Sequence, residues 1–182
     1  MKPNVYIDID VKPGDKGAAS FPHQSSKILT KLHSCFKKEA GRYAIDLPFS
    51  RALFTCIRVF GNSMDDMIAL GSQLHEMEIE NLGRLSFPKK VPENFLGQGV
   101  KNSRYRISSR KSRTQKTRFT RIKQAEEQQL PYFMLKSHST HQAFSLIVKR
   151  EVIENFDLID CNPNSYGLNS EKHTCVLPLM ID

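Results

Sequence analysis

Histidine, serine and tyrosine side chains at three places in the chain are of the types that can cleave a phosphodiester bond. Such cleavage in RNA needs a group that deprotonates or orients the 2′-hydroxyl, a proton for the leaving 5′-oxygen, and support for the developing charge. Imidazole suits the proton transfers because its ordinary pKa lies near about 6.5. Of the six histidines, His33 is the best placed, since it follows Leu32 at the edge of a predicted helix's apolar face and can project into a groove. The alternative is a boundary histidine that makes one hydrogen bond.

A polar turn at residues 137–142 brings hydroxyl and imidazole groups together over a short span. Ser137, Ser139 and Thr140 can grip a scissile phosphate, and the same composition is typical of a hydrophilic hairpin turn. Tyr166, beside Gly167, can reach a phosphate or can simply cover a sheet. The residue types alone leave both alternatives open.

A strongly basic segment indicates a partner for these groups. Between Asn94 and Ala125 there is no Asp or Glu, while ten Lys and Arg residues occur. They are Lys101, Arg104, Arg106, Arg110, Lys111, Arg113, Lys116, Arg118, Arg121 and Lys123. The formal charge of the whole chain is +8, and the remainder holds 17 basic against 19 acidic residues. When cations this close together bind a phosphate backbone, they release the counterions that are condensed on it. The segment therefore predicts a polyanion as partner.

Apolar periodicity predicts the elements that position these residues in the first half of the chain. Residues 5–11 alternate like a strand with one solvated face, and a helix capped by Ser25 or Ser26 runs to about Lys38, with Gly41 as its stop. Strands follow at 43–49 and 55–60, then a helix capped by Ser63 with Met67, Leu70 and Leu74 as its apolar face, and a strand at 83–91. This β-α-β-β-α-β order predicts an α+β protein with a ferredoxin-like domain at residues 1–92.

The second half, residues 93–182, is predicted to be an α/β region that binds an RNA hairpin. Residues 100–107 form a strand or extended arm, and residues 113–129 form an arginine-rich helix with Phe119 and Ile122 as its few apolar anchors. Short strands at 132–135, 144–152 and 174–179 make an antiparallel sheet. Such a helix is expected to be loosely held in the free protein, or to be solvated without a special role.

Composition limits the class of protein. The chain has 182 residues, of which 39% are hydrophobic and 25% charged, and it lacks an apolar run of about 18 residues. Its N-terminus has no signal-peptide pattern, so we expect a cytoplasmic protein without a membrane partner. Cys35, Cys56, Cys161 and Cys175 lie far apart with no Cys-x-x-Cys pair, which predicts free thiols, no structural metal and no cofactor.

Four stretches carry a resemblance to a known family. They are residues 6–13 (YIDIDVKP), 31–33 (KLH), 130–144 (LPYFMLKSHSTHQAF) and 165–168 (SYGL). In this order and at these positions they resemble the CRISPR repeat-cleaving endoribonucleases of subtype I-F, the Csy-type crRNA-processing proteins. The match spans nearly the whole chain, and the Ser-x-Ser-Thr-x-Gln-x-Phe run after Leu-Pro is its most specific piece.

The resemblance implies roles for the candidate catalytic residues. His33 matches a histidine that takes part in proton transfer at the cleavage step, and Ser137 matches a serine that fixes or activates the 2′-hydroxyl. Tyr166 matches an aromatic residue near the scissile phosphate, while Ser139 and Thr140 match hydroxyls around it.

The resemblance also implies how the RNA is held. Phe144 matches an aromatic residue that stacks on the base pair closing the stem. Arg104 matches a reader of base edges, and Arg106 replaces an amide, so that it would favour guanine at the second base read. The basic helix corresponds to a rod laid in the deep groove of the stem. The RNA-binding candidates of this helix are Arg113, Lys116, Arg118 and Arg121, and Arg110 before it is a further candidate.

The function implied is that of a metal-independent endoribonuclease. It would bind the CRISPR repeat hairpin, cut at the 3′ base of the stem, and leave a 2′,3′-cyclic phosphate. The protein, a monomer when free, would then stay on the mature crRNA with the other subunits of a type I-F interference complex. Two alternatives remain open: a hairpin-binding cap subunit without catalysis, and a general basic RNA-binding protein.

Overall fold

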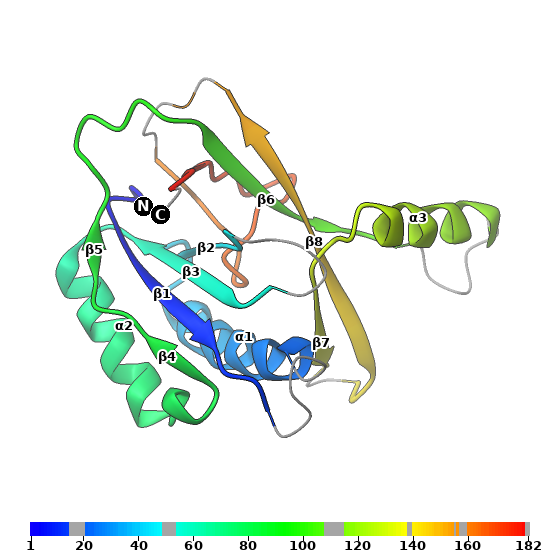
Figure 1. Ribbon diagram of the computed structural model, residues 1–182, viewed down its shortest axis with the longest axis horizontal. Helices are drawn as coiled ribbons and strands as arrows, with labels where there is room; N and C mark the ends of the chain where they lie inside the picture. Colours follow the sequence, from blue (N-terminus) through cyan, green and yellow to red (C-terminus); the bar gives the residue numbers. More distant parts are fainter. Residues whose placement is uncertain are drawn as a thin grey trace.

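The computed structural model describes residues 1–14, 21–48, 54–107, 115–137, 140–154, 156 and 160–180. Within these residues the chain forms two antiparallel sheets and three α-helices (Figure 1). The predicted α+β class is therefore confirmed.

The first sheet has the strand order of a ferredoxin-like fold. Its strands are β1 (Val5–Val11), β2 (Ala44–Asp46), β3 (Cys56–Gly61) and β4 (Gly83–Leu85), in the order β2-β3-β1-β4. A fifth short strand, β5 (Lys89–Lys90), also pairs with β1, so the strand predicted at 83–91 is divided in two. The helices α1 (Phe21–Lys38) and α2 (Met64–Glu76) cover one face (Figure 1), and a 3-10 turn, Ile79–Asn81, follows α2.

Local signals explain where the two helices begin and end. In α2 the Ser63 hydroxyl accepts the Asp66 N–H at 3.2 Å, as predicted for an N-cap. The predicted start of α1 at Ser25 or Ser26 is wrong, because α1 begins at Phe21 with Pro22 in its first turn. Both serine hydroxyls instead donate back to the Pro22 carbonyl. Gly41, at φ +78°, follows the end of α1.

The prediction that β1 has one solvated face is wrong. Tyr6 and Asp8, which alternate with the apolar side chains, are 4% and 7% exposed. Asp8 accepts two hydrogen bonds from the Arg58 guanidinium, at 2.7 and 3.0 Å, and that group lies 4.4 Å from the centre of the Tyr6 ring. The charge is buried because Arg58 neutralises it and donates to it.

The second sheet is the predicted short antiparallel sheet. It contains β6 (Gly99–Tyr105), β7 (Tyr132–Lys136), β8 (Ala143–Ile153) and β9 (Leu177–Pro178), in the order β7-β8-β6-β9. Apolar residues of β7 and β8 join the same core as α1 and β1. The division of the chain at residue 92 stays a prediction, and the core runs across it.

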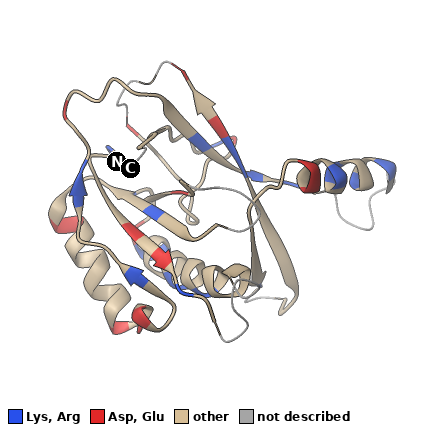
Figure 2. Cartoon of the chain, in the orientation of Figure 1, with Lys and Arg blue, Asp and Glu red and all other residues tan. Residues whose placement is uncertain are grey.

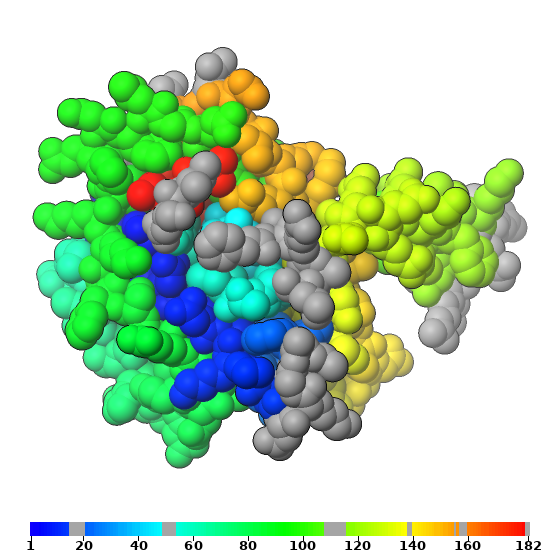
Figure 3. All heavy atoms as spheres, in the orientation of Figure 1, coloured from blue at the N-terminus to red at the C-terminus, as the bar shows by residue number. Residues whose placement is uncertain are grey.

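The basic helix α3 (Gln115–Glu127) stands away from both sheets as an arm (Figures 1 and 3). Figure 2 shows its basic residues toward the far end and its acidic residues at the end near the sheets. Phe119 was predicted as an anchor, but it is 65% exposed; Ile122 is half-buried, and Ala125 is the buried residue of the helix. The helix is therefore attached through its C-terminal turn.

The cysteines follow the prediction only in part. Cys35 and Cys56 are buried free thiols, and burial raises the pKa of Cys56 to about 12. Cys161 and Cys175 form a disulfide instead of staying free. None of the helices in the described ranges has the length and apolar character needed to cross a bilayer.

A buried polar network joins the two sheets. The Asp46 carboxylate, on β2, accepts hydrogen bonds from Arg150 Nε at 3.0 Å and Nη2 at 3.1 Å, both from β8. Asn102 on β6 donates to the same carboxylate at 2.8 Å and to the Ile45 carbonyl at 3.1 Å. Asn169, from the C-terminal segment, donates its side-chain amide to the Asn102 carbonyl at 3.0 Å. Strands from both halves of the chain thus share one carboxylate.

We predict that Asp46→Asn lowers the free energy of unfolding by about 3–5 kcal/mol, because it leaves the Arg150 charge buried without a counter-charge. Urea denaturation followed by circular dichroism measures the change. Glu127→Gln, which breaks the exposed Lys123–Glu127 pair, is the matched control and should cost less than about 0.5 kcal/mol. If Asp46→Asn lowered the free energy of unfolding by as little as the control does, the Arg150 charge would not need the Asp46 carboxylate as its counter-charge.

Candidate functional site

His33 and Tyr166 touch each other although they lie far apart in the sequence. The His33 ring, on α1, stacks on the Tyr166 ring with centroids 4.1 Å apart and planes inclined by 5°. His33 Nδ1 lies 2.6 Å from the Ser165 carbonyl oxygen. A carbonyl only accepts, so Nδ1 carries the hydrogen, and in the neutral ring Nε2 is left with the lone pair. The imidazole is therefore held in one tautomer, with a proton acceptor at Nε2.

The loop that carries Tyr166 is tightly fixed. The Asn164 side-chain oxygen accepts the N–H groups of Tyr166 at 2.8 Å and Leu168 at 3.2 Å. Gly167 adopts φ +73°, and its carbonyl accepts the Ile45 N–H at 2.9 Å. The loop is thus bound to β2, one residue from Asp46. The Ser165 carbonyl was not recognised from the sequence, because a backbone acceptor leaves no residue-type signal. Asn164 was not recognised because its role depends on the conformation of the turn.

The C-terminal segment beside this loop is also tightly hydrogen-bonded. Residues 169–173 form a tight turn in which the Ser170 N–H donates to the His173 carbonyl at 2.8 Å. Asn169 is 4% exposed, and its side chain donates to the Cys175 carbonyl at 2.6 Å. The Cys161–Cys175 disulfide closes the segment that contains Tyr166.

Ser137 lies in a different segment, the turn after β7. The Thr140 N–H donates to its hydroxyl at 3.2 Å, and its own N–H donates to the Gln142 carbonyl at 2.9 Å. Ser139 lies outside the described residues. β7 is held to α1 because the Ser26 hydroxyl accepts the Met134 N–H at 2.6 Å. Ser26 precedes His33 by about two helical turns, so one helix carries both the histidine and the strand that leads to Ser137.

Phe144 and Arg104 lie on the same face of the second sheet. Arg104 pairs with Val148 in the β6–β8 register, and alternation along β8 puts Phe144 on the face of Val148. The Arg104 guanidinium lies 5.8 Å from the centre of the Phe144 ring. With Arg106 and Arg118 they line an open hollow of about 890 Å³. The structure therefore brings a candidate stacking aromatic beside three candidate RNA-binding cations.

The root of α3 is fixed by Tyr105 and Gln124, which were not singled out from the sequence, and by Arg121, which was predicted to bind RNA. The Tyr105 hydroxyl lies 3.1 Å from Gln124 Oε1 and 3.3 Å from the Arg121 carbonyl, and donates toward both. Arg121 Nη1 donates to the Arg106 carbonyl at 2.7 Å. Arg121 thus helps to orient the arm, and Lys116 lies exposed farther out. Arg110 and Arg113 lie outside the described residues.

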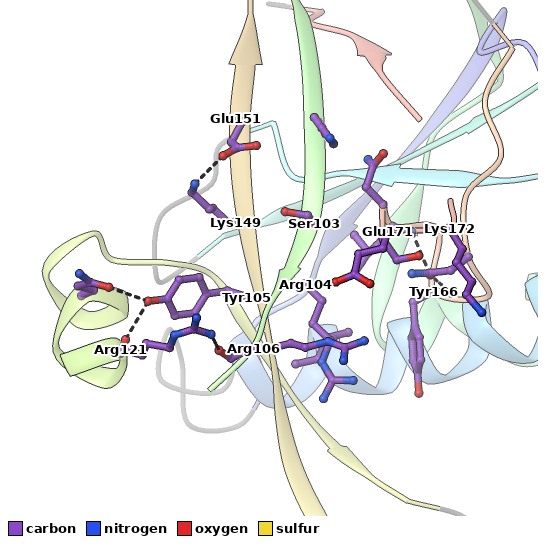
Figure 4. Close-up of a pocket in the computed structure, with 17 residues that line it drawn as sticks. Ser103, Arg104, Tyr105, Arg106, Arg121, Lys149, Glu151, Tyr166, Glu171 and Lys172 are labelled. Atoms are coloured by element: carbon purple, nitrogen blue, oxygen red, sulfur yellow. Dashed lines mark hydrogen bonds and ion pairs between the residues drawn. The ribbon is translucent and has the colours of Figure 1, made fainter. Parts of the chain in front are cut away.

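A second open hollow, of about 780 Å³, lies on the Tyr166 side of β6 (Figure 4). Tyr105 and Arg121 stand at its α3 end, while Tyr166 and Lys172 stand at the C-terminal segment. Lys149 also lines it, and was missed because only the β6–β8 register shows which side of the sheet it faces. In the described ranges no three His, Cys, Asp or Glu side chains gather as metal ligands would.

We predict that Gly167→Ala displaces the Tyr166 loop. A Cβ there would lie 2.9 Å from the Ile45 nitrogen, and φ +73° is strained for alanine. We expect a loss of about 1–3 kcal/mol in unfolding free energy, and loss of the ring-current shift that Tyr166 imposes on the His33 protons in NMR spectra.

Gly71→Ala is the matched control for this substitution. Its Cβ would meet only Leu85 Cδ2, at 3.6 Å, and its helical backbone suits alanine. It should therefore leave the His33 resonances unchanged and stabilise the protein by about 0.5–1 kcal/mol. Unchanged His33 resonances in Gly167→Ala would contradict the fixed geometry of the loop.

The chain is similar to known CRISPR-associated proteins. The family model described as "CRISPR-associated protein (Cas_Csy4)" matches residues 6–178. A search of curated proteins found no match. Among solved structures, a CRISPR-associated protein from Thermus thermophilus is similar at 15% identity and a TM-score of 0.33, covering 84% of this chain and 85% of its own. Because the family model covers almost the entire chain, the protein belongs to the Csy4-type CRISPR-associated proteins of subtype I-F.

Proposed function

We propose that this chain is an endoribonuclease that binds a CRISPR repeat hairpin and cuts it at the 3′ base of the stem. The observation that carries the proposal is the His33 imidazole, which is stacked on Tyr166 and hydrogen-bonded through Nδ1 to the Ser165 carbonyl. This arrangement supplies a basic nitrogen beside a strongly cationic surface. Both are what the cleavage of RNA through its 2′-hydroxyl needs.

In the proposed reaction His33 Nε2 takes part in moving a proton from the 2′-hydroxyl toward the 5′-oxygen. The 2′-oxygen forms a bond to the adjacent phosphorus as the bond from phosphorus to the 5′-oxygen breaks. One proton leaves the 2′-oxygen and one reaches the 5′-oxygen, so no water is consumed. The products are a 2′,3′-cyclic phosphate and a 5′-hydroxyl. Ser137, whose hydroxyl is held by the Thr140 N–H, would fix the 2′-hydroxyl.

The proposed binding surface is the face that carries Phe144 and Arg104. Phe144 would stack on the base pair that closes the stem, with Arg104 and Arg106 at base edges. The arm would lie along the deep groove, where its cations neutralise phosphates. The arm's proposed contacts are Arg110, Arg113, Lys116, Arg118 and Arg121, and those of the Ser137 turn are Ser139 and Thr140.

After cleavage the protein would remain on its product as a subunit of a type I-F interference complex. Slow or single turnover suits this task, since the same contacts hold the stem before and after the cut. We propose that the free protein is a monomer in the cytoplasm and that the repeat RNA is its first partner.

We predict that His33→Ala reduces the cutting rate by about 10²–10⁴-fold, because it removes the proton-transfer group, while hairpin affinity stays close to that of the wild type. Single-turnover cleavage of the cognate repeat RNA and a filter-binding titration measure the two quantities. His23→Ala, an exposed histidine on the same helix, should cut at the wild-type rate.

Three outcomes separate the proposal from its alternatives. Cutting by His33→Ala at the wild-type rate would remove His33 from the mechanism. Tight and selective hairpin binding without any cutting by the wild type would identify a cap subunit. Equal affinity for unrelated hairpins would identify a general RNA-binding protein.

We also predict that cutting continues at an unchanged rate in excess EDTA, with enough monovalent salt to keep the stem folded. The resident groups proposed here move the proton and bind the phosphate without a metal ion. The measurement is the single-turnover rate before chelation, after chelation, and after Mg²⁺ is restored. A rate that falls on chelation and returns with Mg²⁺ would contradict the mechanism.

A further inference from the structure

The hollow beside Tyr166 is used only in part by the hairpin contacts proposed above. Arg104, Arg106 and Arg121 belong to both, whereas Lys101, Lys149 and Lys172 line the hollow and have no role in those contacts. Lys101 pairs with Glu151 and Ser103 with Lys149 in the β6–β8 register, so these four side chains share one face of the sheet. Arg104 lies on the opposite face, and it lines the same hollow. The cavity therefore continues around the margin of β6 (Figure 4), from the site face to the outer face.

The lining is strongly cationic. It contains two carboxylates, Glu151 and Glu171, against six cations. The six are Lys101, Arg104, Arg106, Arg121, Lys149 and Lys172. Lys149 is paired with Glu151, and the excess positive charge favours a ligand that carries several negative charges.

Aromatic side chains stand at both ends of this cationic lining. Tyr105 is near α3, and Tyr166 is on the C-terminal segment. Base–aromatic stacking is tolerant of sequence, and together with a cationic groove it is how proteins hold single-stranded nucleic acid. The volume of about 780 Å³ lies within the range of about 300–1,000 Å³ of sites that bind small organic ligands, which leaves room for one or two nucleotides.

Tyr166 belongs to the hollow and also stacks on His33. An RNA strand that passes the scissile phosphate at His33 therefore meets this cavity next. The double-stranded stem cannot enter this cavity, because a duplex is too wide to turn around the margin of β6. A single RNA strand bends freely.

We infer that this hollow binds the single-stranded RNA that adjoins the base of the hairpin, with Lys101, Lys149 and Lys172 on its phosphates. The inference rests on the proposed function. The single strand is either the 5′ flank that stays joined to the stem or the 3′ flank that the cut releases. Both have the same chemistry, and the experiment separates them.

The test compares three RNAs that each have a deoxynucleotide at the cutting position, so that no 2′-oxygen can attack. One is the bare hairpin, one carries only the 5′ flank, and one only the 3′ flank. We expect wild-type protein to bind one flanked RNA about tenfold more tightly than the bare hairpin, with a salt dependence steeper by roughly 0.7 for each added phosphate contact.

Two variants of the lining and one control variant then test whether the flank lies in the hollow. Lys101→Ala with Lys172→Ala should abolish the tenfold gain and leave bare-hairpin affinity unchanged. Glu171→Gln, which removes a repelling charge from the lining, should increase the gain. Lys27→Ala with Lys90→Ala, exposed lysines outside the hollow, should change neither affinity. Circular dichroism of each variant checks that it is folded.

The outcomes distinguish this inference from the proposed function. Equal affinity of wild-type protein for all three RNAs, or a gain that persists without Lys101 and Lys172, would overturn the inference alone. If the bare hairpin itself were bound no better than an unrelated hairpin, the proposed function would fail.

Discussion

One carboxylate, that of Asp46, is the point on which the rest of the structure depends. It lies on β2, a strand of three residues in the first sheet, and is almost completely buried, yet it accepts hydrogen bonds from two strands of the second sheet. A buried charge is tolerated only when its lone pairs are filled. Arg150 and Asn102 can fill them only if β2, β6 and β8 come together. The requirement to satisfy this group therefore fixes how the two halves of the chain meet.

The site is a consequence of that junction. Ile45, the neighbour of Asp46, donates its N–H to the Gly167 carbonyl. The Asn102 carbonyl accepts a hydrogen bond from the Asn169 side-chain amide. Both contacts fix residues that follow Tyr166, and with the Asn164 side chain they hold its ring on His33. The first half of the chain thus supplies the imidazole, and the second half supplies the carbonyl that selects its tautomer. Neither half holds the proton acceptor in place by itself.

Local patterns were enough to predict much of this fold. The periodic apolar residues of α1 and α2, the Ser63 cap and the order of strands and helices along the chain follow from patterns that are local in the sequence. The burial of Tyr6 and Asp8 could not be foreseen, because Tyr6 packs with Cys161, Cys175 and Leu177 of the C-terminal segment and Asp8 pairs with Arg58 across the β1–β3 register. The Cys161–Cys175 disulfide was not predicted, because the expected cytoplasmic location favoured free thiols. Among the site residues, His33 and Tyr166 were named mainly through a family resemblance, and Lys149 and Asn164 were missed because their roles depend on register and on a turn.

The exposed arm has a consequence for how such a protein can change over generations. Among the described side chains of α3, Ala125 in the C-terminal turn is the buried one, and Phe119 faces solvent. Substitutions along the outer turns of α3 remove no packed side chain, so they have little effect on folding. Substitutions near Gly167 or Asp46 affect the fold and the imidazole together. Substitutions on the arm can therefore change which RNA stem is recognised, while the core keeps the cleaving groups unchanged.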